Sequence, residues 1–359
     1  MKKPEKEFVL GKKRPRVLFL GNGLCRSYGG MSWNKLLDEL KEKDKYPAEA
    51  KNYLMPMPLK AAMLTNNTLA SKMRNVVKPH DKQDPKIDGY DWSSFIKATP
   101  EMKEHLVRLI RDRFDYVLTT NYSYEIEAAL TDRSNLSESQ ISRIMHFHEV
   151  EHAQTQFLVN TFNDADGIPI WHVHGEARKP DSMIIGSYYY GKLLRRCVER
   201  LDGSSEPEEE GKKRNSKGSR TSLFKALNKQ GKPIRIGSWI DAFVLGDVYM
   251  LGFGLDFSES DIWWLLEYKA NHCDICGSTF FYEPQSETSN NCVHNAMIPC
   301  DKRAQFFDGN QCKTYLLENT YKVKTINFEI AVANNEDYVR FYEKAIQDIT
   351  CTADKPVYN

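Results

Sequence analysis

The hydrophobic positions of the chain gather in short apolar runs that end in glycine or asparagine, and most of these runs are followed by a helical stretch. The runs 16–20, 115–121, 168–175 and 247–254 have this form. A continuous apolar run of this length, bounded by turn residues, predicts a strand buried on both faces. The stretches 99–110, 124–130 and 261–270 predict the helices between them. Alternating strands and helices predict an α/β fold.

The remaining pattern extends the same order. A helix is predicted over 32–45, strands over 278–282 and 322–328, and a closing helix over 337–349. The fold class that follows is a Rossmann-like parallel sheet with helices on both faces. Ligands of such sheets lie at the carboxyl ends of the strands, so we expect the turns at Gly21, Asn121 and Gly252 to share one edge.

Polar segments set the predicted domain limits. Residues 1–15 are expected to form a loose charged tail, and 16–350 a single decorated domain. A helical insertion is predicted at about 34–113. Residues 202–220 are polar and rich in Gly and Ser, and their acidic and basic residues lie in separate runs. This composition predicts a disordered loop. A cysteine-containing segment follows at 273–312.

Composition limits the partners and the cellular compartment that we expect for the chain. The chain has 359 residues, with 50 basic and 49 acidic side chains and a net charge of +1. This balance gives no bulk attraction to nucleic acid, so no direct nucleic-acid partner is expected. Since no run of about 20 apolar residues is present, no membrane span is expected. The basic start lacks the apolar core of a secretory signal, and the eight cysteines suit a reducing setting, so we expect a cytoplasmic protein.

Two of the strand ends carry glycines. The segment 21–30 reads GNGLCRSYGG, and 251–261 reads LGFGLDFSESD. Glycines after a buried strand let the backbone approach a pyrophosphate, and a following helix adds a favourable dipole. A tight turn between strand and helix explains the same glycines, and a full GxGxxG is absent. Ser258 or Ser260 can simply cap the later helix.

The other two strand ends carry candidate chemistry. Thr119-Thr120-Asn121-Tyr122 places an asparagine that can hold a ribose hydroxyl or a water, or that simply forms a turn,. In the segment 172–176, HVHGE, alternation predicts that His172 and His174 share a strand face. An imidazole near neutral pKa suits a general base. Structural histidines are the alternative, favoured more for His172 than for His174.

Taken together and in this order, the four motifs resemble the sirtuin-like family of NAD-consuming proteins, over residues 16–330. The resemblance implies that Asn121 and His174 are catalytic, with Asn121 placing the nicotinamide ribose and His174 acting as the base. The cofactor-binding residues that it implies are Gly21, Asn22, Gly23, Cys25, Gly29, Thr120, Gly252, Gly254 and Asp261. Cys25 stands where the family has a serine, and the family's proline is absent after Gly30.

Two departures separate the chain from the deacylase sirtuins. No aspartate follows Asn121, and only Cys197 lies between Gly175 and Cys273, where deacylases carry a zinc ribbon. The sequence is more similar to the bacterial defence-associated branch. Members of that branch cleave NAD to nicotinamide and ADP-ribose or a cyclic form. NAD is therefore expected as the substrate, with no metal needed for catalysis.

The resemblance also implies a biological role. The chain is expected to be the effector of an anti-phage abortive-infection system that depletes NAD. It implies a homo-oligomer and a separately encoded partner, such as a hexameric translocase ATPase, an Argonaute-type protein or another sensor. The alternatives are a non-catalytic sensor that binds NAD or ADP-ribose, and a protein deacylase.

Two further motifs suggest metals. His148, Glu149 and His152 satisfy the HExxH pattern of zinc proteases, but no third ligand is evident and the preceding residues alternate like a strand,. Cys273 and Cys276 have the spacing of half a zinc knuckle, which Cys292 and Cys300 would complete only at irregular spacing. A structural zinc site and reduced loop cysteines stay open as alternatives.

Overall fold

The computed structural model describes residues 7–27, 58, 100–131, 145–146, 158–160, 162–165, 167–176, 182–203, 223, 233–284, 313–328, 330 and 335–352. Several predicted features lie outside the described residues. They are Gly29, the helix expected at 32–45, most of the insertion at about 34–113, the loop residues 204–220, the HExxH segment 148–152, Cys292 and Cys300.

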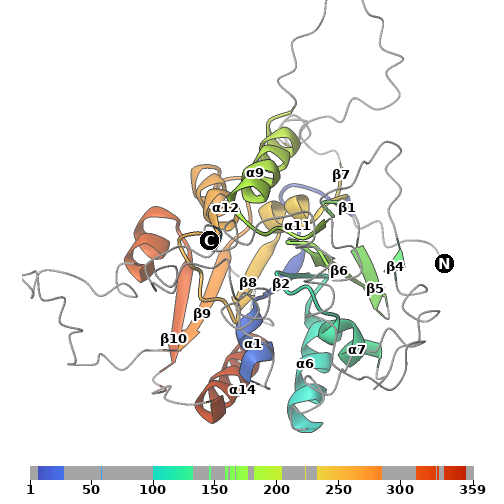
Figure 1. Cartoon of the computed structure of the whole chain (residues 1–359), viewed down its shortest axis with the longest axis vertical. Helices are drawn as coiled ribbons and strands as arrows, with labels where there is room; N and C mark the ends of the chain where they lie inside the picture. The colour runs from blue at the N-terminus through green and yellow to red at the C-terminus, as the bar shows by residue number, and fades with distance from the viewer. Residues whose placement is uncertain are drawn as a thin grey trace, which may run out of the picture.

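An open sheet of eight strands forms the centre of the described structure, in the order β10-β9-β8-β2-β3-β6-β5-β4 (Figure 1). Six of these strands run parallel: β2 (Arg16–Leu20), β3 (Tyr116–Thr119), β6 (Ile168–His172), β8 (Asp247–Leu251), β9 (Thr279–Pro284) and β10 (Lys324–Phe328). At one end, β5 (Phe162–Ala165) pairs antiparallel with β6, and β4 (Met145–His146) pairs antiparallel with β5. Numbered along the chain, the parallel strands have the order 3-2-1-4-5-6, which is that of Rossmann-type dinucleotide-binding sheets. The predicted Rossmann-like α/β fold is confirmed.

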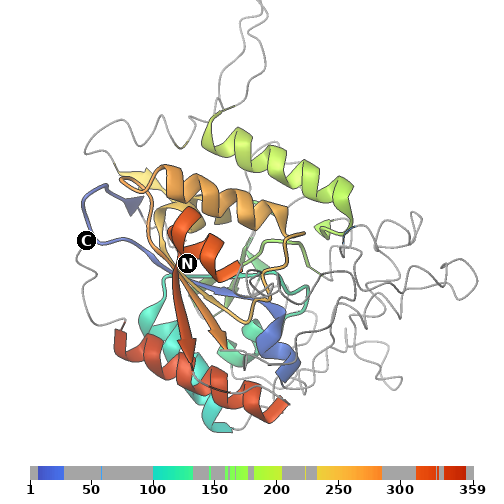
Figure 2. The same cartoon turned by 90° about the vertical axis from the view of Figure 1, so that its left-hand side faces the viewer.

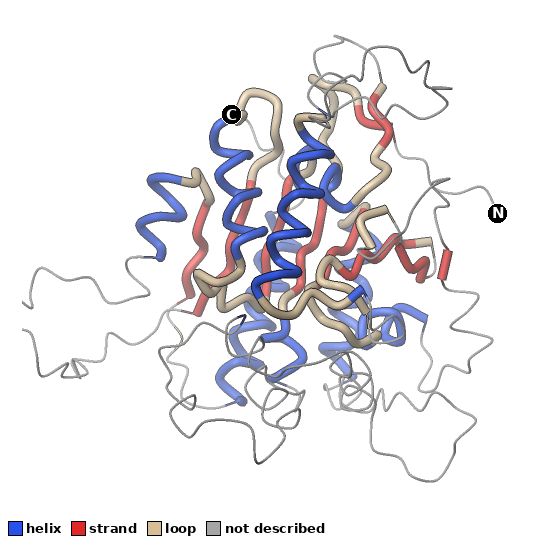
Figure 3. The backbone as a smooth tube through the Cα atoms, turned by 45° about the horizontal axis from the view of Figure 1, so that its top comes forward, coloured by secondary structure: helices blue, strands red, loops and turns tan. Residues whose placement is uncertain are grey.

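Helices cover both faces of the sheet, as Figure 2 shows in side view. One face carries α1 (Asn22–Ser27), α6 (Pro100–Arg113), α7 (Glu125–Thr131) and α14 (Asn335–Thr352). The other carries α9 (Ser187–Leu201), α11 (Trp239–Leu245) and α12 (Ser260–Asn271). The π-helix η4 (Leu316–Thr320) precedes β10. Figure 3 shows the strands as a red layer between these blue helices.

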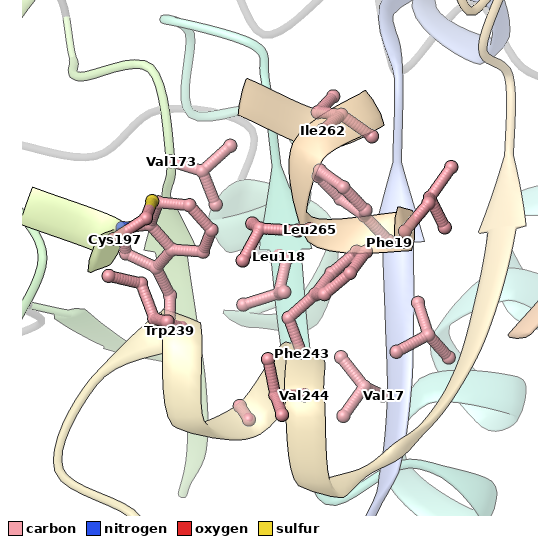
Figure 4. Packing of buried hydrophobic residues seen from close by; sticks show 14 of the residues in the cluster. Val17, Phe19, Leu118, Val173, Cys197, Trp239, Phe243, Val244, Ile262 and Leu265 are labelled. Atoms are coloured by element: carbon pink, nitrogen blue, oxygen red, sulfur yellow. The ribbon is translucent and has the colours of Figure 1, made fainter. Parts of the chain in front are cut away.

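The central strand β2 shows why the sheet needs helices on both sides. Val17 and Phe19 belong to the core that contains α11 and α12, whereas Leu18 and Leu20 belong to the core that contains α6 and α14. All four are at most 1 % exposed, which is the pattern of a doubly covered parallel strand. Figure 4 shows Phe19 beside Phe243, whose ring centroids lie 5.8 Å apart in an edge-to-face pair.

Residues 7–15, which belong to the segment 1–15 predicted as a loose charged tail, make defined contacts, and residues 1–6 lie outside the described residues. Glu7–Phe8 (β1) pairs antiparallel with Ile234–Arg235 (β7). Phe8 is 3 % exposed within the core cluster, and the guanidinium of Arg14 donates to two main-chain carbonyls at 3.0 and 3.2 Å. The segment is ordered because one apolar side chain among the charges is buried.

One strand ends earlier than predicted. The strand expected over 168–175 stops at His172, and a turn carries the next two residues. The turn closes because Gly175 N donates to His172 O at 3.0 Å, and Gly175 takes φ +92°, a conformation that favours glycine,. His172 and His174 therefore do not share a strand face, which corrects the alternation argument.

Candidate functional site

The carboxyl ends of four neighbouring strands align in one row. Leu20 of β2 pairs with Leu251 of β8 and with Thr119 of β3, which in turn pairs with His172 of β6. The segments that begin at Gly21, Thr120, Val173 and Gly252 therefore leave the sheet at one edge, as the sequence predicts. The strand order reverses between β2 and β8, and this is the position at which open α/β sheets bind their ligands.

Three glycines at this edge pack the start of α1, which follows β2, against the loop after β8. Gly21 N donates to Leu251 O at 2.9 Å, and Gly23 N donates to Gly252 O at 2.7 Å. An added Cβ would lie 2.5 Å from Gly252 O at Gly21, and 2.5 Å from Tyr342 Oη at Gly23. Gly252 itself has φ +79°. The tight-turn interpretation of these glycines is therefore supported, with the space beside them filled by protein atoms.

Gly254 differs from the other glycines of the motifs. It is exposed, and an added Cβ would meet no described atom within 4 Å. Its carbonyl accepts a hydrogen bond from Lys313 Nζ at 3.1 Å. Of the motif glycines that the structure describes at this edge, Gly254 leaves room for a ligand next to the backbone.

His172 is buried and has oxygen atoms at both ring nitrogens. Its Nδ1 lies 2.6 Å from Asn121 O, and its Nε2 lies 2.8 Å from Glu127 Oε1, which also accepts from Asn163 Nδ2. Two acceptors around one ring favour the doubly protonated imidazolium. Burial acts to lower the pKa of His172, but the charge and hydrogen bond of Glu127 raise it to about 9. His172 thus fixes the main chain at Asn121 and has a structural role.

His174 forms a buried pair with Asp261 at the same edge. His174 Nε2 and Asp261 Oδ2 lie 2.9 Å apart, and both side chains are at most 1 % exposed. Asp261 lies in the first turn of α12, where the helix dipole favours a negative charge,. When Nε2–H donates to this carboxylate, the lone pair of the ring is on Nδ1. No described residue makes a hydrogen bond to Nδ1.

The surroundings of the pair tune its protonation. Burial acts to lower the pKa of His174, but the charge and hydrogen bond of Asp261 and the charge of Glu259 raise it above its ordinary value. Burial raises the pKa of the half-buried Glu259 to about 7. The ring of Tyr190 meets His174 edge-on, with centroids 5.4 Å apart. An imidazole held by a carboxylate at one nitrogen, with its other nitrogen unpaired, is the arrangement of a general base, and in His174 this second nitrogen is buried,.

The other predicted site residues have different positions. Thr120 and Asn121 are buried at the same edge, and Asn121 N is held by Thr119 Oγ1 at 3.1 Å. Asn22 and Cys25 lie in α1 after β2. Cys273 and Cys276 follow α12, and both are free thiols. Burial raises the pKa of the Cys276 thiol to about 11, which disfavours the thiolate that binds zinc,.

The sequence motifs do not predict which carboxylates contact the two histidines. Asp261 was assigned to cofactor binding, but its carboxylate contacts His174 across 87 residues of sequence. Glu127 was given no role, although it contacts His172 across 45 residues. No local pattern carries such pairs, because both depend on which helices follow which strands in the sheet. The one available signal was the acidic first turn of the helices that contain them.

The chain was compared with protein-family models and with curated proteins. No family model matches it, and no curated protein matches it. Among the described residues, no group of three or more His, Cys, Asp or Glu side chains is placed to hold a metal ion. Within the same residues, no helix is long and apolar enough to cross a membrane.

Proposed function

We propose that the chain is an NAD+ glycohydrolase, which cleaves NAD to nicotinamide and ADP-ribose. The observation that carries the proposal is the buried Nδ1 of His174, which has no hydrogen-bond partner among the described residues, on a ring held by Asp261. The ring lies at the edge where open sheets of the order 3-2-1-4-5-6 bind their ligands,. Gly254 supports it, because its backbone is open to a ligand at the same edge. The four sequence motifs support it through their resemblance to NAD-consuming proteins.

The proposed reaction makes modest demands on the protein. His174 Nδ1 takes a proton from water, the water oxygen forms a bond to C1′ of the nicotinamide ribose, and the bond from C1′ to nicotinamide breaks. The bonding electrons leave with the nicotinamide, which departs as a neutral molecule. Asn121 holds the ribose or the water, and Asp261 stabilises the imidazolium. A positioned base contributes about 10²–10⁴-fold, and orientation supplies further acceleration.

The biological part of the proposal rests on the resemblance alone. In it, the chain is a cytoplasmic homo-oligomer that depletes NAD as the effector of an anti-phage abortive-infection system. A separately encoded partner, such as a hexameric translocase ATPase, senses the infection. Nucleic acid, if it is the trigger, is recognised by that partner.

The test is incubation of the purified chain with NAD, followed by chromatography of nicotinamide and ADP-ribose and calorimetry of NAD binding. We expect His174→Ala to lower kcat by about 10²–10⁴-fold, and Asn121→Ala to abolish cleavage, with both variants folded. The matched control is His105→Ala, because His105 is exposed on α6. This control should cleave NAD at the wild-type rate.

The outcomes separate the alternatives. Full activity in His174→Ala or Asn121→Ala contradicts the assignment. NAD binding without cleavage, unaffected by His174→Ala, favours the non-catalytic sensor instead. Nicotinamide release that depends on an added acyl-lysine peptide favours the deacylase.

A further inference from the structure

A pocket of about 710 Å³ lies at the other edge of the sheet, where the parallel strands begin. It is lined by the first residues of β2, β8, β9 and β10, which are Arg16, Asp247, Thr279 and Lys324. The candidate NAD site lies at the opposite ends of these strands. The pocket is therefore separate from the site of the proposed hydrolysis.

The pocket is strongly basic. Its described lining includes seven lysines and arginines and a single carboxylate, Asp247. The chain as a whole has 50 basic and 49 acidic residues, so the excess reflects the arrangement of the fold. Six of the cationic residues come from two short segments, which are Lys12, Lys13, Arg14 and Arg16, and Lys322 and Lys324. Such a cluster of like charges attracts anions.

The wall of the pocket is held by charged side chains that cross-link the main chain. Lys269 Nζ donates to the carbonyls of Phe243, Gly246 and Ser278 at 2.9, 3.1 and 3.3 Å. The guanidinium of Arg14 donates to two further carbonyls. These bonds join the end of α11, α12 and the start of β9, so the pocket exists before any ligand enters. A preformed site loses less entropy on binding.

The lining residues indicate the class of ligand. Lysine and arginine donors suit phosphate oxygens, and the exposed side chains of Lys12, Lys13, Lys322 and Lys324 surround the pocket. Lys322 takes φ +56°, which is uncommon for a non-glycine residue and marks a constrained turn,. The half-buried Tyr321 also lines the pocket and is an aromatic residue against which a base can stack, while its ring contacts that of Trp263 with centroids 5.2 Å apart,. The volume is within the range of small-molecule sites.

We propose that this pocket binds a nucleoside polyphosphate, with its phosphates between the 12–16 and 322–324 segments and its base against Tyr321. The opening supplies several cationic side chains from two segments, which suits a ligand with more than one phosphate group,. This binding is independent of the proposed NAD cleavage, and neither needs the other to occur.

The test is isothermal titration calorimetry of the full chain with ATP, inorganic triphosphate and adenosine as probes. We expect ATP and triphosphate to bind with one site per chain, and more weakly as salt rises. Replacing two cationic contacts in the variant Lys322→Gln/Lys324→Gln should weaken both ligands by about tenfold or more. Tyr321→Leu should weaken ATP alone, and retained triphosphate binding would show that this variant is folded.

The matched control removes two positive charges elsewhere. Arg195→Gln/Lys344→Gln changes exposed residues of α9 and α14 and should bind ATP like the wild type. Asn121→Ala should also retain ATP binding, even if it loses NAD cleavage. The proposal is overturned if ATP gives no binding, if the Lys322/Lys324 variant keeps the wild-type affinity, or if Asn121→Ala loses ATP. Binding of single-stranded DNA without binding of ATP would equally overturn it.

Discussion

At the residue scale, the two histidines differ in what their second nitrogen meets. Both ring nitrogens of His172 face oxygen acceptors, so both are occupied by contacts with Asn121 and Glu127. His174 has one nitrogen at Asp261 and a second that no described residue engages. The difference explains why His172 has a structural role and His174 is suited to proton transfer, although both lie in the same five-residue motif.

The pair of His174 and Asp261 predicts a pH signature. In Asp261→Asn the carboxylate that raises the pKa of His174 is lost, so the pKa falls. A base acts only when deprotonated, so the acidic limb of the pH–rate profile should move to lower pH, and kcat should fall at least about tenfold. The measurement is kcat/KM for nicotinamide release between pH 5 and 9.

The comparison variant is Asp112→Asn, which removes an exposed carboxylate on α6. It should leave the acidic limb in place. An unchanged limb in Asp261→Asn, or an equal shift in both variants, would show that Asp261 does not act through His174.

At the scale of elements, the start of α1 and the loop after β8 are packed tightly against each other at their glycines. Gly21 and Gly23 have protein atoms where a Cβ would lie, whereas Gly254 has open space. The same glycine-rich pattern therefore has two physical causes, which are backbone packing and access to the backbone.

This difference predicts opposite outcomes for two similar substitutions. Gly21→Ala places a Cβ 2.5 Å from Gly252 O, and overpacking of this kind lowers the free energy of unfolding by about 1–3 kcal/mol. Gly254→Ala should change it by less than about 0.5 kcal/mol. Urea denaturation of both variants measures the difference. Equal stability of the two variants would refute the packing role of Gly21.

The elements that sequence analysis recovered are those with a local signal. The strands at 16–20 and 247–251 are apolar runs closed by glycine, and the helix at 100–113 begins at a proline. α11 was missed because all seven of its residues are buried, so its sequence has no polar face to mark a helical period. α1 was missed because its glycine was assigned to a turn.

The candidate site was recovered in part for a related reason. Residues that directly follow strands, such as Asn121 and His174, can be placed from the order of elements, because parallel strands end at one edge. The partners of the histidines cannot, because Asp261 and Glu127 reach them only through tertiary packing. The strand β6 also ends at His172 because Gly175 N donates a hydrogen bond to His172 O. The alternation of residues along a strand does not predict this hydrogen bond.

At the scale of the whole molecule, the free energy of unfolding should depend on whether His172 is charged. Its pKa is raised from 6.5 to about 9, chiefly by Glu127 acting against burial. A raised pKa stabilises the fold fully below pH 6.5, and this stability is lost as the pH rises through about 9,. Glu127→Gln should therefore lower the free energy of unfolding by on the order of a few kcal/mol below the usual histidine pKa, and by progressively less toward pH 9,.

Urea titrations of the wild type and of Glu127→Gln at several pH values measure this loss. Glu104→Gln is the control, because Glu104 is an exposed residue of α6 paired with Arg108. Its effect on stability should be small and should not change with pH over this range. A cost for Glu127→Gln that is independent of pH would contradict an ionised pair with His172.

The order of the strands in the sheet also determines how late in synthesis the central strand β2 acquires both of its neighbours. β2 lies between β3 and β8, and its first residue, Arg16, pairs with Asp247. A ribosome that adds about 5–20 residues per second synthesises β8 on the order of ten to fifty seconds after β2. Until then the apolar central strand has a missing neighbour on one side. The nascent chain thus carries an apolar strand with one open edge until β8 is made, and such an edge is a site at which strands of other chains can pair.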